Sequence, residues 1–147
     1  AEIDYKEKYE EIKSLYESEN RNNAIGGIFN SLTTNEEVFV NALMAYTEKI
    51  WSRSNVTVSD FQRNLGFSKS KLYRTMMRII GTSPNGFIKE YRLNKALQIL
   101  NRRTSNISEI AYQTGFSSPT YFSKCFHETY GILPSIFIKQ ISQSEID

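Results

Sequence analysis

"GFSSPTYFSKCFHETYG", residues 115–131, is similar to an earlier segment of the same chain, "GFSKSKLYRTMMRIIG", residues 66–81. Each copy starts with glycine and phenylalanine, passes through serine into apolar residues at helical spacing, and ends at a second glycine. Serine is favoured at helix starts, and glycine suits the left-handed conformation in which many helices end. Each copy therefore predicts a turn followed by a short helix.

A second short helix is predicted ahead of each copy. "TVSDFQRNLGF" begins at Thr57 and "NISEIAYQTGF" begins at Asn106. Both open with the spacing of a capping box, in which the first residue and the residue three positions later, here Asp60 or Glu109, satisfy each other's backbone N–H groups. A short helix, a turn and a second helix make up a helix-turn-helix motif. The two predicted units span about 57–81 and about 106–131.

The two units match along their whole length, with one small insertion. Phe67 aligns with Phe116 at an offset of 49 residues, whereas Ser68 aligns with Ser118 at an offset of 50, so the second turn holds one extra residue. The match continues at the larger offset as far as "FIK" in both copies. This agreement favours a duplication over chance.

The segment between the units, "SPNGFIKEYRLNKALQILNRR", carries apolar residues on one helical stripe behind a serine cap. It predicts a linker helix over 84–102, about 28 Å long at about 1.5 Å per residue. No sustained alternation of apolar and polar residues indicates a strand. The sequence therefore predicts an all-α fold, in which two helix-turn-helix units are joined by a long linker helix and preceded by an N-terminal helical segment.

Charge is distributed unevenly along the chain. Residues 55–140 contain twelve Lys and Arg against four Asp and Glu, a net +8, whereas residues 1–54 contain six against ten, a net −4. A basic module after an acidic lead indicates a polyanionic partner for the module. Charge alone leaves a solvated basic surface as an equal alternative.

Composition excludes several classes of function. One cysteine and one histidine are too few for an internal disulfide or a Cys/His metal cluster. The sequence has no glycine-rich phosphate loop and no nucleophile with an assigned base, so we expect no enzyme, no metal and no cofactor. No apolar run approaches the roughly 18 residues of a membrane span, and the acidic start is unlike a secretory signal, so we expect a cytoplasmic protein.

The second helix of each unit has an apolar and a polar face. The apolar positions are Leu72, Met76 and Ile79 in the first unit and Phe122, Phe126 and Thr129 in the second. The polar positions are Ser70, Tyr73 and Arg74 in the first, and Thr120, Ser123, Lys124 and His127 in the second. Short donors beside a long cation suit the DNA major groove, which admits an α-helix and presents base acceptors. A solvated surface is the alternative for either helix taken alone.

The motifs "LGFSKSKLYR", "GTSPNGFIKEYRLNKALQIL", "ISEIAYQTGFSSPTYFSKCF" and "YGILPSIFIK" carry a resemblance to a known family. From about residue 56 to residue 139 the chain resembles the DNA-binding domain of the AraC/XylS family of bacterial transcription regulators. The pattern "LYR…GTSPNGFI…RLNKA" resembles the form of this domain found at the C-terminus of hybrid two-component regulators. The resemblance implies sequence-specific binding of double-stranded DNA through two successive major grooves, by what we expect to be a fragment of a larger regulator.

The resemblance implies a set of contact residues, matched by position. The DNA-binding set is Lys69, Ser70, Lys71, Tyr73 and Arg74 in the first unit, and Ser118, Pro119, Thr120, Ser123, Lys124 and His127 in the second. Arg92 and Ala96 match the family's linker-helix pattern as packing or bracing residues. Gln62 stands where a small residue is usual. Lys124 stands where arginine is common, and a lysine lacks the bidentate fork of arginine. His127 is equally well explained as a plain surface histidine, and Cys125 as a half-buried filler.

The expected domain organisation follows from these assignments. The predicted segments are a helical lead and linker over 1–34, a helix over 35–54 that packs on or leads into the next part, and an AraC-type DNA-binding domain over 55–140. That domain comprises the first helix-turn-helix (57–81), the linker helix (84–102), the second helix-turn-helix (106–131) and a closing helix (134–140).

Double-stranded DNA is the expected partner. RNA polymerase and a second copy of the chain, joined through upstream regions, are further candidate partners, and no membrane contact is expected for this fragment. The rival interpretation is a helical interaction module whose basic face binds an acidic protein. Salt-dependent binding to duplex DNA separates the two interpretations.

Overall fold

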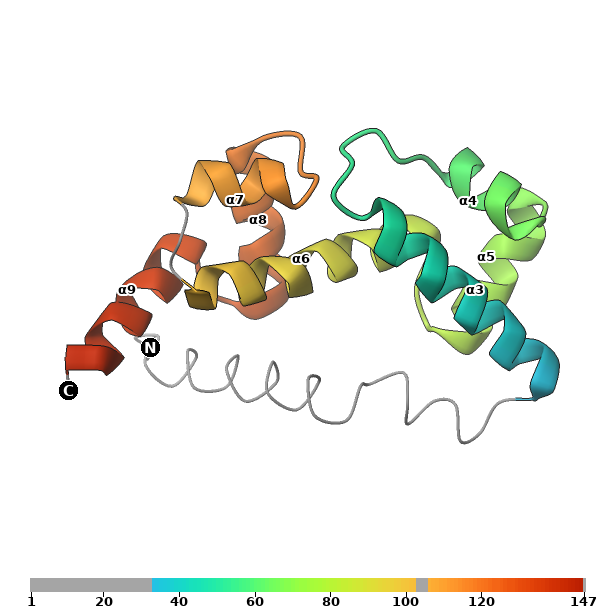
Figure 1. Cartoon of the computed structure of the whole chain (residues 1–147), viewed down its shortest axis with the longest axis horizontal. Coiled ribbons are helices and arrows are strands. Elements are labelled where there is room, and N and C mark those ends of the chain that lie inside the picture. The colour runs from blue at the N-terminus through green and yellow to red at the C-terminus, as the bar shows by residue number, and fades with distance from the viewer. Residues whose placement is uncertain (1–32, 103–105, 147) are drawn as a thin grey trace.

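The computed structural model describes residues 33–102 and 106–146, and within these ranges every regular element is an α-helix (Figure 1). The elements are α3 (Thr34–Ile50), α4 (Val58–Leu65), α5 (Lys69–Ile79), α6 (Pro84–Arg102), α7 (Ile107–Gln113), α8 (Pro119–Tyr130) and α9 (Pro134–Ile146). The predicted all-α fold with two helix-turn-helix units is confirmed. The helical lead predicted before residue 33 lies outside the described residues. None of these helices is long and apolar enough to cross a lipid bilayer.

Two hydrophobic cores lie along α6, one toward each end of that helix (Figure 1). Phe87 and Ile88 of α6 pack with side chains of α3, α4 and α5 in the first core. Leu93, Leu97 and Leu100 pack with side chains of α7, α8 and α9 in the second. Because one helix enters both cores, α6 fixes the position of each unit relative to the other.

Helix α3 belongs to the first unit. Four of its apolar side chains lie in the first core: Phe39, Val40, Leu43 and Ile50. Thr47 is also buried, and its hydroxyl is satisfied there because it donates a hydrogen bond to the Leu43 carbonyl at 2.7 Å. Tyr46 and Trp51 pack against this core and are only partly buried. The domain boundary expected at residue 55 therefore divides a single core.

The local signals at the start and end of the repeated helices are confirmed, except that the predicted capping box is reciprocal only in the first unit. Thr57 accepts a hydrogen bond from the Asp60 N–H, and the Asp60 carboxylate accepts one from the Thr57 N–H at 2.8 Å. In the second unit Asn106 accepts from the Glu109 N–H at 2.9 Å, but the Glu109 carboxylate contacts the Asn106 side-chain amide instead of its backbone. The turn glycines at 66 and 115 both have positive φ, 72° and 85°.

Two expectations at the end of the second unit are wrong in detail. Thr129, expected on the apolar face of α8, is exposed, and Tyr130 packs on the second core instead, with its ring 4.8 Å from that of Phe126. The closing helix, expected to end at residue 140, continues to Ile146. It continues because Ile141, four residues after Phe137, extends the same apolar stripe into the core.

Leu43→Ala tests whether α3 is integral to the first unit. Leu43 is fully buried, so the substitution is expected to lower the free energy of unfolding by about 2–5 kcal/mol. Val38→Ala on the same helix is the matched control, because Val38 is 63% exposed and its loss should cost under about 0.5 kcal/mol. Urea unfolding followed by circular dichroism measures both. Equal, small effects would show that α3 is dispensable for the first unit.

Candidate nucleic-acid interface

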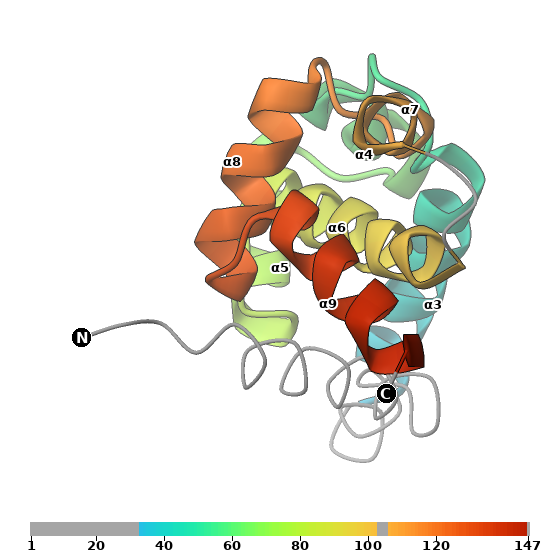
Figure 2. The same ribbon diagram turned by 90° about the vertical axis from the view of Figure 1, so that its left-hand side faces the viewer.

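Helices α5 and α8 lie on the same side of α6, with α3 on the opposite side (Figure 2). Both start at a serine that caps the helix. Ser68 accepts a hydrogen bond from the Lys71 N–H at 3.2 Å, and Ser118 accepts one from the Tyr121 N–H at 3.1 Å. The equivalent caps give the two helices equivalent starting points, so their outer faces are presented in the same way by the two units.

The outer face of α5 carries most of the residues predicted for it. Leu72 and Met76 are fully buried, and the opposite face exposes Lys69, Ser70, Lys71 and Arg74, while Tyr73 is half-buried. The Arg74 Nε makes one long contact, 3.4 Å, to the Ser70 carbonyl of its own helix. The guanidinium is thereby directed along the exposed face of α5.

Lys71 is held over an aromatic ring at the start of α5. Its ammonium lies 4.5 Å from the ring centroid of Phe67, which in turn stacks on Phe39 of α3 at 5.2 Å. A cation above an aromatic face is attracted by the ring quadrupole. This contact restricts a long side chain that would otherwise sample many rotamers.

The outer face of α8 has the same organisation. Phe122, Cys125 and Phe126 face the second core, so Cys125 is buried instead of half-buried as predicted. The exposed residues are Thr120, Lys124 and His127, and the half-buried ones are Ser118, Pro119 and Ser123. All the residues predicted to contact DNA therefore lie on α5, on α8 or at the start of α8.

The cations on the outer faces differ from those elsewhere in the chain. Within the described residues the ion pairs involve other cations: Arg78 pairs with Glu36 at 2.6 Å, Lys95 with Glu48 at 2.9 Å, and Arg63 with Asp60. Hydrogen bonds from Thr33, and then Arg78, hold the pKa of Glu36 below its usual value, so this acid stays charged. No such pair within the described residues involves the outer-face cations Lys69, Lys71, Arg74 and Lys124.

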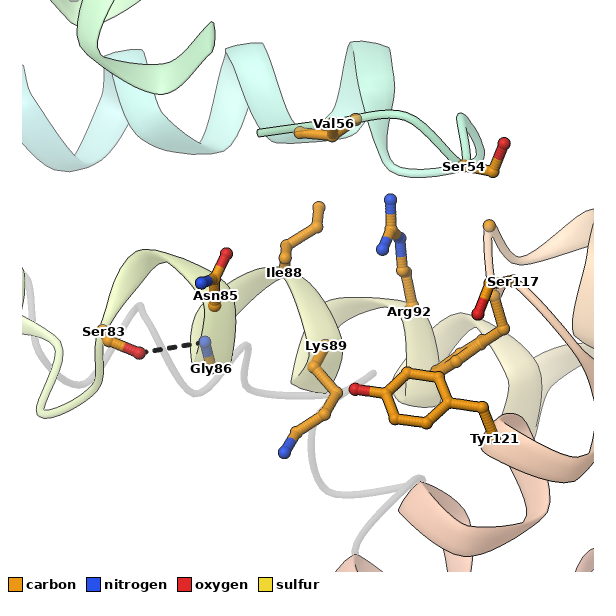
Figure 3. A pocket seen from close by; sticks show the side chains of 12 residues that line it. Ser54, Val56, Ser83, Asn85, Gly86, Ile88, Lys89, Arg92, Ser117 and Tyr121 are labelled. Atoms are coloured by element: carbon orange, nitrogen blue, oxygen red, sulfur yellow. Dashed lines mark hydrogen bonds between the residues drawn. The ribbon is translucent and has the colours of Figure 1, made fainter. Parts of the chain in front are cut away.

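Arg92 of α6 joins the first unit to the second, and sequence reasoning placed it among the bracing residues. Its Nε donates to the Trp51 carbonyl at 2.9 Å, and its Nη2 donates to the Arg53 carbonyl, in the loop between α3 and α4. Figure 3 shows the guanidinium pointing from α6 toward that loop. Burial lowers the pKa of Arg92 from the usual arginine value.

Gly115 of the second turn closes this junction. A Cβ at this position would lie 2.8 Å from the Arg92 Nε and 2.8 Å from the Trp51 carbonyl oxygen. The backbone there also has a φ of 85°, a conformation that residues with a side chain rarely adopt. The sequence marked Gly115 as a helix-end glycine, but its contact with Arg92 joins three segments that are distant along the chain and was not predictable.

A second contact fixes α3 against α6. The Glu48 carboxylate accepts hydrogen bonds from the Tyr91 hydroxyl and from the Lys95 ammonium, the latter at 2.9 Å. Lys95 also lies 5.2 Å from the ring centroid of Trp51. Burial and the neighbouring Glu48 raise the pKa of Tyr91, so its hydroxyl stays protonated as a donor.

Gly115→Ala and Gly66→Ala form a matched pair that tests the junction. Both glycines have positive φ, but a Cβ at Gly66 meets nothing within 4 Å. Gly66→Ala should cost only backbone strain, about 1–2 kcal/mol, whereas Gly115→Ala adds overpacking of about 1–3 kcal/mol against Arg92 and a carbonyl. Chemical denaturation measures the difference. Equal costs would mean that the loop and Arg92 yield freely at the junction.

A family model described as a helix-turn-helix domain matches residues 62–140, more than half of the chain. Among curated relatives, Histidine kinase P4 of Formosa agariphila is 33% identical over 113 residues, which is 77% of this chain but only 8% of that protein. This chain therefore corresponds to a small part of that relative's length.

Solved structures agree with this match. A transcriptional regulator from Chromobacterium violaceum, described as having an AraC-type DNA-binding domain, is 25% identical with a TM-score of 0.67, covering 76% of this chain and 98% of that one. The DNA-binding domain of AdpA, solved in complex with a target DNA, has a TM-score of 0.68 at 16% identity, covering 74% and 96%, and shares the fold. With two capped helices on one side of a shared linker helix, this chain belongs to the AraC-type helix-turn-helix family of DNA-binding transcription regulators.

Proposed function

We propose that this chain reads two successive major grooves on one face of a DNA duplex, with α5 in one groove and α8 in the next. One observation carries the proposal: the two helices lie on the same side of a single rod, α6, which enters both hydrophobic cores (Figure 2). Its 19 residues give a length of about 28 Å, close to the roughly 34 Å between successive grooves.

The outer-face residues divide into two kinds of contact. Arg74 carries the planar fork that binds guanine through two hydrogen bonds, so it is assigned to base recognition. Lys124, at the corresponding place on α8, is a point charge and is assigned to phosphate. Lys69 and Lys71 lie in the first turn of α5, near a helix N-terminus that itself favours anions, and contact phosphate there.

The remaining predicted residues contribute through short polar groups. Ser70, Tyr73, Thr120 and Ser123 offer hydroxyls that hydrogen-bond to base edges or phosphate oxygens. Ser118 and Pro119 shape the start of α8. His127, exposed in the last turn of α8, contacts the DNA backbone. Each unit thus offers few side chains to the bases, and joining them makes the second docking event intramolecular at high effective concentration.

The chain acts as the DNA-reading part of a longer regulator in this proposal. Support comes from its small share of the curated histidine kinase's length. Such a regulator brings the domain to DNA in the cytoplasm. Contact with RNA polymerase and pairing with a second copy through upstream regions remain hypotheses that the DNA-binding experiments below do not require.

The division of roles is tested by Arg74→Ala and Lys124→Ala on a site chosen by selection from random duplex DNA. Arg74→Ala should cost about 1–3 kcal/mol of binding and relax the preference at one base pair. Lys124→Ala should weaken binding evenly across sequences and lower the salt slope by about one. Arg63→Ala, which removes an exposed cation on α4, controls for charge alone. If Arg74→Ala leaves both affinity and preference at control levels, base recognition by Arg74 is wrong.

The spacing of the two units is tested in the DNA itself. Inserting five base pairs between the half-sites turns one half-site about half a revolution away from the other. Because α6 and the Arg92 junction hold the units at a fixed spacing, specific affinity should fall toward that of a single half-site while non-specific binding persists. Footprinting measures protection of each half-site. Protection of both at the original protein concentration would show that the units dock independently.

A further inference from the structure

A groove of about 480 Å³ lies between the two units, over the N-terminal half of α6 (Figure 3). Its walls come from the loop before α4, from α6, and from the turn and first residues of α8. The polar side chains that line it include Ser54, Asn85, Lys89, Arg92, Ser117 and Tyr121. None of these is among the residues that sequence reasoning assigned to DNA contact.

The chemistry of the groove suits an anion. Two cations and several hydroxyls line it, and none of the described residues in its walls carries a carboxylate. Arg92 is occupied by the carbonyls of Trp51 and Arg53, whereas Lys89 makes no ion pair within the described residues. In Figure 3 the Tyr121 hydroxyl points toward the Lys89 side chain. The neighbouring Cys125 thiol raises the pKa of Tyr121, so this hydroxyl stays protonated.

The one extra residue of the duplication lies in this groove. Ser117 stands between Phe116 and the helix-capping Ser118, where the first unit passes directly from Phe67 to Ser68. Ser117 is exposed and lines the groove. The two turns otherwise match, so the insertion adds a hydroxyl at the place where the second unit faces α6.

The location of the groove identifies its ligand. It lies over the N-terminal half of α6, between the loop before α4 and the start of α8, and Tyr121 on its wall is one helical turn before Lys124 of the proposed α8 contact face. When α5 and α8 occupy successive major grooves of one duplex, the minor groove between them passes over this region. The edges of that minor groove are phosphates. Phosphate contacts make up at least half of the hydrogen bonds between proteins and DNA.

We propose that this groove binds the phosphodiester backbone of the DNA segment between the two half-sites, through the Lys89 ammonium and the Ser117 hydroxyl, with Tyr121 as a neighbouring donor. The proposal rests on the proposed two-groove function and extends its contact surface to the middle of the protein. The groove contributes affinity and register, and it reads no base directly.

Methylphosphonate substitution tests the proposal with the full chain. Replacing the phosphates between the half-sites by neutral methylphosphonates should reduce wild-type affinity about three- to tenfold. Lys89→Gln should show the same loss on unmodified duplex, a salt slope lower by about one, and no further loss on the modified duplex. Lys49→Gln, an exposed lysine on α3, is the charge-matched control and should remain sensitive to the modification. Ser117→Ala, at an exposed position, provides a second variant with a smaller loss.

The outcomes separate the two proposals. If wild-type protein shows no salt-sensitive binding to the selected duplex, the proposed function itself fails. If it binds, but the central methylphosphonates have no effect or Lys89→Gln loses as much on modified as on unmodified DNA, the groove proposal is overturned. Saturable chemical-shift changes at Lys89 and Ser117 with inorganic phosphate alone, without a methylphosphonate effect, would assign the groove to a small anion and also overturn it.

Discussion

Helix α6 enters two separate hydrophobic cores, and this packing sets where the two helix-turn-helix units lie relative to each other. Phe87 and Ile88 anchor the first unit at one end, and Leu93 and Leu100 lie in the second core. Neither unit can rotate about the rod without exposing apolar surface, at roughly 25 cal/mol for each Å². The positions of α5 and α8 relative to each other therefore follow from packing that is remote from their outer faces.

Electrostatics sorts the cations of the chain into two groups. On the α3 side, Glu36 and Glu48 engage Arg78 and Lys95, and these pairs hold α3 to α5 and to α6. On the outer faces of α5 and α8, cations such as Arg74 and Lys124 are exposed and outside these pairs. Four cations of the basic segment, Lys69, Lys71, Arg74 and Lys124, are thus exposed on α5 and α8 and take no part in these pairs.

Much of the fold could be predicted from the sequence, because its signals are local. Thr57, Ser68 and Ser118 act on backbone N–H groups within one turn, so capping spacing alone located the helix starts. The membership of α3 in the first core and the meeting of Arg92 with Gly115 depend on contacts between residues far apart in the sequence. Phe39 stacks on Phe67, 28 positions later, and Gly115 lies 23 positions after Arg92, so helical spacing gives no signal for either contact. The groove residues Lys89 and Ser117 were not predicted for the same reason. In the sequence they are ordinary surface residues, and only the placement of the second unit beside α6 brings them together.

The two turn glycines show how a duplicated motif loses its symmetry. Gly66 faces open space, whereas Gly115 is enclosed by Arg92 and the Trp51 carbonyl. Substitutions in the first turn are limited by local backbone strain, but a substitution in the second requires a coordinated change in the linker helix and in a loop of the other unit. The two copies consequently differ in evolvability: the first can vary its turn independently, while the second drifts only together with its neighbours.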